Sequence, residues 1–101
     1  MKKLLTKKEI NNFQDDGAAV LRKKFDIRWI KELKKGIAKD IKSPSPRFKS
    51  HTTQKNIPAY LEDYWTWDRI PEFKDFVFNS PISQIASELM SAKKVKLIQQ
   101  F

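Results

Sequence analysis

The chain has 101 residues, no cysteine and one histidine, and its formal net charge is +9. A chain of this length forms one domain at most, which we take as residues 1–101. No apolar run approaches the ~20 residues of a membrane-spanning helix, and the basic start lacks the apolar run that a secretory signal has behind it. The absence of cysteine excludes disulfide and thiolate chemistry and fits a reducing compartment. We therefore expect a cytoplasmic protein without a membrane partner.

The positive charge is concentrated in the first half of the chain. Residues 1–50 contain fifteen Lys or Arg against six Asp or Glu, whereas residues 51–101 contain six of each. Such asymmetry is typical of proteins that bind nucleic acid or anionic membranes. However, seventeen of the basic residues are Lys and only four are Arg, and phosphate recognition favours the planar Arg fork. The composition therefore favours a solvated surface over a nucleic-acid site. A small Lys-rich, non-enzymatic module that binds nucleic acid or a protein partner stays as the alternative.

The first predicted helix has a recognisable start and end. Thr6 and Glu9 have the spacing of a capping box, Ile10 and Phe13 form a narrow apolar stripe, and Gly17 is placed to end the helix. The short apolar run 18–21 follows. It predicts a buried strand, although its length alone leaves a helix open.

A longer helix is predicted from about residue 27 to residue 42. Its apolar residues recur at intervals of three and four and define one face: Ile27, Ile30, Leu33, Ile37 and Ile41. Asp26 is a suitable N-cap, lysines occupy the other faces, and Gly36 is expected to allow a close approach by a neighbouring element. Pro44 and Pro46 stop the helix. Residues 43–59 then form an irregular loop, which is either a lid or substrate-contacting loop or a surface connector.

The densest aromatic stretch lies between Tyr60 and Phe78, which contains seven of the twelve aromatic residues. Large rings dominate burial energetics, so the rest of the domain is expected to pack here. Residues 60–67 lack a one-face pattern and are predicted to be irregular. Asp68 or Ile70 then caps a helix with Pro71 in its first turn. The buried face of that helix is formed by Phe73, Phe76 and Val77.

Two further elements complete the pattern. Ser80 and Pro81 start the cleanest amphipathic helix, whose apolar positions are Ile82, Ile85, Ala86, Leu89 and Met90. Residues 95–101 alternate apolar and polar side chains, as in a strand with one buried face. The predicted class is α+β and mainly helical, with the opening of a sheet that these residues do not complete.

The residue types limit the chemistry. A zinc site requires Cys or His ligands and a facial-triad iron site requires two His, so His51 alone predicts no metal site; it is interpreted as a surface loop residue, with ligand contact as the alternative. The two glycines provide neither a nucleophile elbow nor a phosphate loop. Adjacent acids such as Glu62 and Asp63 favour solvated positions over a proton-sharing pair. Arg69, beside Asp68 and two tryptophans, predicts a structural ion pair, with a carboxylate clamp as the alternative.

Several blocks resemble the N-terminal part of the phytanoyl-CoA dioxygenase family. The opening block Thr6–Gly17 with Val20 and Leu21 is similar to the family's first helix and strand, and residues 45–48 resemble a bacterial subgroup. The most specific block is the string Glu-Asp-Tyr-Trp-Thr-Trp-Asp-Arg-Ile-Pro-Glu-Phe at 62–73, followed by matching residues at 76–81 and 85–90.

The resemblance implies the helices and first strands of a double-stranded β-helix (jelly roll). It also implies an enzyme that uses Fe(II) and 2-oxoglutarate to hydroxylate a small-molecule substrate. The family's His-x-Asp motif and its distal ligands lie beyond these residues, so this portion is expected to lack the metal-binding core and to be inactive alone. Three residues are carried over as cosubstrate or pocket contacts: Arg69, Gln99 and Phe101. The last residues, 98–101, depart from the string expected in the subgroup.

Overall fold

The computed structural model describes residues 2–51, 55, 58–98 and 100. The elements in chain order are α1 (Lys7–Asp16), α2 (Ile27–Lys42), β1 (Lys49–Ser50), β2 (Leu61–Glu62), α3 (Pro71–Asn79) and α4 (Ile82–Met90). The described residues thus form a small, mainly helical α+β chain, as predicted. A two-stranded sheet is far from a double-stranded β-helix, so that part of the expectation stays a prediction. None of the helices in the described ranges is long and apolar enough to cross a membrane.

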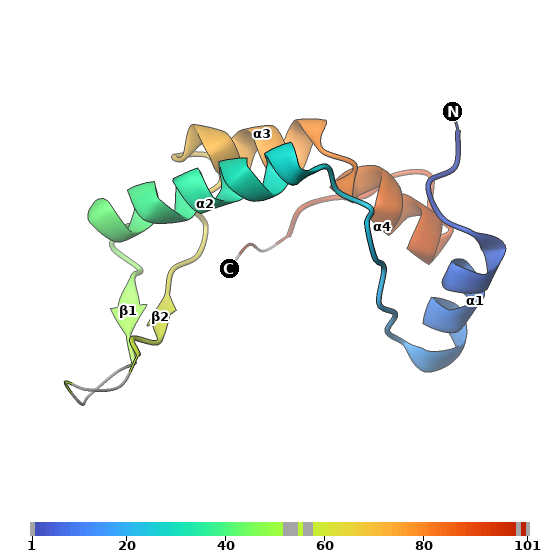
Figure 1. The fold of residues 1–101 in the computed structure, drawn as a ribbon, viewed down its shortest axis with the longest axis horizontal. Coiled ribbons are helices and arrows are strands. Elements are labelled where there is room, and N and C mark those ends of the chain that lie inside the picture. Colours follow the sequence, from blue (N-terminus) through green and yellow to red (C-terminus); the bar gives the residue numbers. More distant parts are fainter. Residues whose placement is uncertain (1, 52–54, 56–57, 99, 101) are drawn as a thin grey trace.

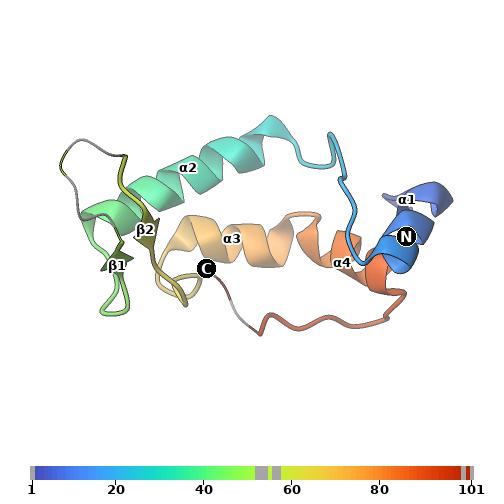
Figure 2. The ribbon, with the colours of Figure 1, turned by 90° about the horizontal axis from the view of Figure 1, so that it is seen from below.

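The elements form an arch rather than a ball. In Figure 1, α2 and α3 run side by side across the top, the β1–β2 hairpin descends at one end, and α1 packs on α4 at the other. Figure 2 shows α3 between α2 and the segment that leads to the C-terminus. The radius of gyration is 16.2 Å, whereas a compact domain of 100 residues has about 13 Å. The chain therefore encloses little core of its own.

Helix α1 begins and ends as the sequence predicts. Thr6 accepts a hydrogen bond from the Glu9 N–H, and the Glu9 carboxylate accepts one from the Thr6 N–H, at 3.1 and 2.9 Å. Gly17 adopts the left-handed conformation, with φ of 76°, that glycine tolerates best. The helix is held against α4 partly by the Gln14 side-chain amide, which donates to the Leu89 carbonyl at 2.7 Å.

Helix α2 also has the predicted bounds and N-cap, because the Asp26 carboxylate accepts a hydrogen bond from the Arg28 N–H. The predicted buried face is wrong in part. Trp29 and Gly36 are buried, but much of the stripe is open: Ile30, Ile37 and Ile41 are 44%, 51% and 53% exposed. Since α3 covers only one flank of the helix, half of the apolar stripe has no cover among the described residues.

Gly36 allows the close approach that the sequence predicts. A Cβ at this position would lie 2.5 Å from Cε1 of Phe73 on α3. Further along the same contact, Phe76 stacks on Phe25 and meets the Trp29 ring edge-on, with centroids 5.6 and 6.0 Å apart. The aromatic stretch thus supplies the interface between α2 and α3.

The helices after the aromatic stretch begin close to their predicted starts. Pro71 is the first residue of α3, and Ile70 is its N-cap without a side-chain hydrogen bond. In α4 the helical hydrogen bonding starts at Ile82, one residue later than predicted, with Pro81 at the N-cap. Ser80 still provides a side-chain hydrogen bond at the start of the helix, because its hydroxyl accepts from the Ile82 N–H at 3.2 Å.

Four predicted segments differ in the structure, and one of them is 60–67, which was predicted to be irregular but contains β2. Residues 18–21 form no strand, and Val20 is 75% exposed. The loop 43–59 contains the two residues of β1, which pair with β2 in antiparallel register, Lys49 with Glu62 and Ser50 with Leu61. Residues 95–98 form no strand either, and Ile98 is 85% exposed. The reason is common to both missing strands. A strand needs a neighbour with which to pair, and the described part of the chain places none beside either segment.

Candidate functional site

A hollow of about 470 Å³ lies between the C-terminal half of α2, strand β2 and the start of α3. Its apolar walls come from all three elements and from the loop before β1: Ile37, Ile41, Phe48, Tyr60, Leu61 and Phe73. Its polar lining consists of Asp40, Glu62, Asp63, Thr66 and Gln100. The hollow therefore combines three acidic side chains with aromatic and aliphatic ones, and no Lys or Arg lines it. This is unusual in a chain that carries a net charge of +9.

Asp63 joins the end of β2 to the turn that follows α2. Its carboxylate accepts hydrogen bonds from the backbone N–H and the hydroxyl of the buried Ser45, and from the Tyr64 N–H at 2.8 Å. Burial by itself raises the pKa of Asp63, but the hydrogen bonds from Ser45 and Tyr64 outweigh it, so the net pKa is lowered. Asp63 is therefore held in its ionised form.

The pKa of Asp40 is shifted in the opposite direction. Burial raises its pKa, and the hydrogen bond and repulsion from Asp63 raise it further, while the Arg69 guanidinium opposes the change. With the pKa of Asp63 lowered and that of Asp40 raised, Asp40 is the first of the two carboxyl groups to take up a proton as the pH falls. This contradicts the interpretation of Asp63 as a solvated acid. The adjacent Glu62 also lines the hollow, and its carboxylate pairs with His51 at 2.8 Å.

Arg69 acts within the fold as a clamp. Its Nη2 donates to Asp40 at 2.7 Å and its Nη1 donates to the Ser43 carbonyl at 2.8 Å, at the C-terminal end of α2. The ion pair favoured by the sequence is present, although its partner is Asp40 rather than a residue next to α3. The role of Arg69 as a 2-oxoglutarate contact stays a prediction, since a bound carboxylate would have to share a guanidinium that Asp40 already holds.

The backbone at Trp65 is strained and is held from two sides. Its φ of 59° is uncommon for a bulky residue and costs of order 1–3 kcal/mol. On one side Arg47 donates to the carbonyls of Tyr64 and Trp65, at 3.0 and 2.9 Å. On the other side the Trp65 N–H donates to the Gln100 carbonyl at 2.9 Å.

Gln100 is a central residue that sequence reasoning missed. Its side-chain oxygen accepts three hydrogen bonds, from the N–H groups of Thr66 and Trp67 at 2.7 and 2.9 Å and from the Thr66 hydroxyl at 3.1 Å. The predicted contacts Gln99 and Phe101 lie outside the described residues. The alternating pattern placed Gln100 on the exposed side of a strand, so no signal in the sequence singled it out.

The residues present do not fit Fe(II). The single histidine, His51, lies on the hairpin, pairs with Glu62 and contacts the Tyr60 ring with centroids 5.4 Å apart. Within the part of the chain that the structure describes, no three His, Cys, Asp or Glu side chains are grouped as a metal site requires. A facial triad needs two histidines, and the sequence contains one.

Comparison of the chain with models of known families, with curated proteins and with solved structures gives no match.

Proposed function

We propose that this chain is the N-terminal helical layer of an Fe(II)- and 2-oxoglutarate-dependent hydroxylase similar to phytanoyl-CoA dioxygenases. In this role it packs against a jelly-roll body that carries the metal ligands, and it does no redox chemistry itself. The small-molecule substrate would bind to that body. The family assignment rests on the string at residues 62–73.

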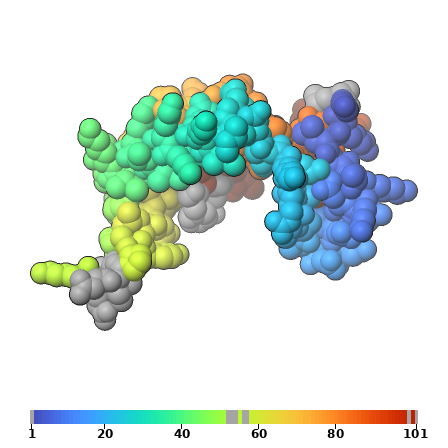
Figure 3. Space-filling model, in the orientation of Figure 1, coloured from blue at the N-terminus to red at the C-terminus, as the bar shows by residue number. Residues whose placement is uncertain are grey.

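The observation that carries the packing role is the uncovered half of the α2 stripe. Three isoleucines on one side of α2 are about half exposed, and Leu61 and Leu97 are 38% and 47% exposed. Figure 3 shows the open underside of the arch between the hairpin and α1. Contiguous exposed apolar surface marks an interaction site, and a helix hydrophobic on both flanks belongs between two packed layers. A second layer against this side of α2 completes the core that the arch lacks.

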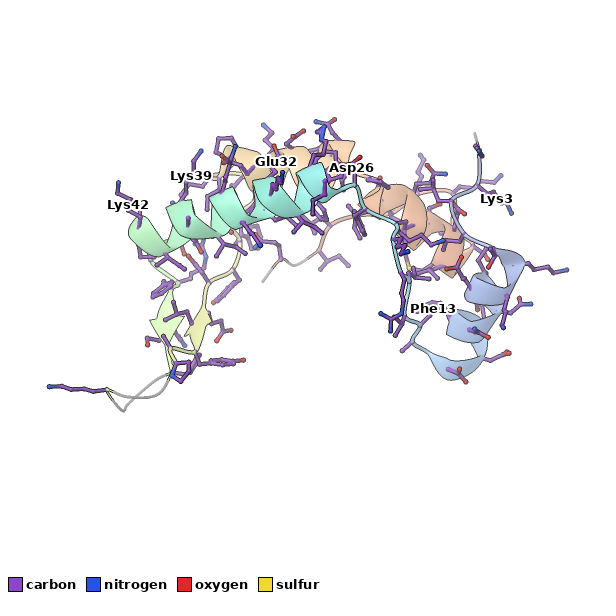
Figure 4. The ribbon with its side chains drawn as sticks, viewed as in Figure 1. Lys3, Phe13, Asp26, Glu32, Lys39 and Lys42 are labelled. Carbon is purple, nitrogen blue, oxygen red and sulfur yellow. The ribbon has the colours of Figure 1, made fainter. Side chains whose placement is uncertain are left out.

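The lysines fit the same arrangement. Figure 4 shows Lys39 and Lys42 on the outer side of α2, away from the hairpin. Lys39 pairs with Glu72 on α3 at 2.6 Å. In a helix that lies between a second layer and water, the charged side chains occupy the outer side. The Lys-rich half of the chain then serves solubility.

Calorimetry tests where the chemistry lies. Titration of Fe(II) into the 101-residue chain, with and without 2-oxoglutarate, is expected to give no stoichiometric binding that depends on 2-oxoglutarate. The same titration with a known dioxygenase of this family serves as the positive control. Stoichiometric binding that required 2-oxoglutarate would contradict the proposal.

The coding DNA tests the family assignment. If the reading frame downstream of Phe101 continues to a His-x-Asp motif and a later histidine, the longer protein contains the metal ligands that the proposal requires. A DNA-binding titration against salt concentration addresses the alternative. A steep fall of log K with log salt indicates contacts between several lysines and phosphates and would favour the Lys-rich binding module instead.

A further inference from the structure

Two surfaces among the described residues have opposite character. The first is the acidic hollow described above, whose apolar walls include the exposed Ile37 and Ile41 on α2. The three acids of its lining face its aromatic and aliphatic walls; Asp40 is partly neutralised by Arg69 and Glu62 by His51. The carboxylate of Asp63 accepts hydrogen bonds from Ser45 and Tyr64, which are uncharged donors and leave its negative charge in place. An extended segment with basic and aliphatic side chains complements this lining.

The second surface is the segment 93–98, of sequence Lys-Lys-Val-Lys-Leu-Ile. Lys93, Lys94 and Lys96 are exposed, and so are Leu97 and Ile98, at 47% and 85%. Its backbone forms no backbone–backbone hydrogen bond with another described residue. The segment thus combines backbone groups that have no backbone partner among the described residues with three positive charges and two open aliphatic side chains. These are the features that an acidic apolar groove recognises.

We propose that the acidic hollow is a docking surface for residues 93–98 of a second copy of this chain. The two surfaces meet at Gln100, which lines the hollow and lies two residues after Ile98. Because they are adjacent, a two-fold axis near Gln100 brings each segment into the hollow of the other copy, which is a closed isologous arrangement. The net charge of +9 opposes association elsewhere on the surface. The acidic hollow is the surface on which a basic segment of a second copy can bind, although both copies carry the same net positive charge.

This inference does not rest on the proposed function. If a jelly-roll body covers the same side of α2, a longer protein that includes the body will be monomeric through this surface, while the 101-residue chain will associate. A negative result in the iron or coding-DNA test therefore does not affect the dimer proposal. Absence of a dimer likewise does not affect the proposed packing role.

Sedimentation velocity tests the dimer. An interface made of residues 93–98 and the hollow is small, so we expect the dimer to dissociate with a Kd between about 1 µM and 1 mM. The chain is therefore studied across that range of concentrations. We expect a monomer that converts to a dimer as the concentration rises. A chain that is monomeric throughout, or that forms open-ended larger species, overturns the proposal.

Charge reversal identifies the surface. Lys96→Glu and Glu62→Lys are each expected to weaken association about tenfold or more, because like charges then face each other. The double variant is expected to recover most of the affinity. Lys8→Glu, which makes the same charge change on the exposed side of α1, is the matched control and leaves association unchanged. Circular dichroism confirms that each variant keeps its helices.

Isotope-filtered NMR on a mixture of labelled and unlabelled chains provides the direct readout. The proposal requires intermolecular contacts between the methyl groups of Ile37 or Ile41 and those of Leu97 or Ile98. A dimer that lacks these contacts and is insensitive to both charge reversals uses another surface and overturns the proposal.

Discussion

At Gly36 the backbone of α2 lies against the Phe73 ring, and this contact sets the distance between α2 and α3. The Cβ of an alanine here would lie 2.5 Å from Cε1 of Phe73 and 2.8 Å from Cδ1. Such distances require the ring or the helix to move. Glycine at a helix interior normally costs up to ~1 kcal/mol relative to alanine, so the two effects act in opposite directions and can be compared by experiment.

We expect Gly36→Ala to destabilise the chain by about 1–3 kcal/mol, because overpacking outweighs the gain in helix propensity. Urea denaturation followed by circular dichroism measures the change. Phe73→Leu removes the ring that the new methyl group meets, so Gly36→Ala is expected to be much less costly in that background. A stabilising effect of Gly36→Ala in the native background would show that the ring moves aside freely.

Among the elements, the contact between the N-terminal segment and α4 depends on one carboxylate. The Leu4 N–H donates to both oxygens of Glu88, at 3.1 and 3.0 Å, and the Leu5 N–H donates to Oε1 at 3.0 Å. These hydrogen bonds to the backbone of Leu4 and Leu5 lower the pKa of Glu88. Leu5 is one of the few buried apolar side chains among the described residues. The carboxylate therefore helps to hold a piece of core in place.

A lowered pKa predicts a pH-dependent attachment of this segment. The contribution of Glu88 is fully present above the pKa of an unperturbed glutamate, about 4.3, and is lost as the pH falls through the lower folded-state pKa. The amide NMR signals of Leu4 and Leu5 are expected to shift together below pH 4.3. Glu88→Gln should abolish that shared transition and increase amide exchange at both residues at neutral pH. Persistence of the transition in Glu88→Gln would assign it to another group.

At the scale of the whole molecule, Gln100 closes the arch by linking the C-terminal segment to residues 65–67. Thr66, which supplies two of the three donors to the Gln100 side chain, is only 1% exposed. When a buried donor loses its acceptor, the free-energy cost of removing that donor from water is no longer offset by a hydrogen bond. The link joins positions more than thirty residues apart in sequence, so it constrains the overall shape and not only a local turn.

Gln100→Ala is expected to destabilise the chain by about 1–3 kcal/mol, because three donors lose their acceptor. The fluorescence of Trp65 and Trp67 should change at the same time, since their backbone is released. Lys94→Ala, at an exposed position on the same segment, is the control and should stay within about 0.5 kcal/mol of the native chain. Both are measured at concentrations where the chain is monomeric. Equal effects of the two variants would refute the clamping role.

The sequence by itself determined the helices. Their starts and ends depend on residues within one turn of each other, such as Thr6 with Glu9, Asp26 with Arg28, and Pro71. Capping is a short-range interaction, and the spacing of a capping box or of a proline is visible in the sequence. The glycine contact at residue 36 was predictable for a related reason, because a glycine inside an apolar helix needs a packing explanation.

Only the tertiary structure decided which half of the α2 stripe is buried, which segments become strands and which residue clamps the aromatic stretch. Periodicity defines an apolar face but not the neighbour that covers it, and here α3 covers the side of Trp29 and Gly36 while Ile37 stays open. Residues 95–98 have a strand pattern but no adjacent strand among the residues that the structure describes. Pairing is a long-range interaction that a local pattern cannot supply. The role of Gln100 depends on where the chain returns, which is a property of the folded molecule alone.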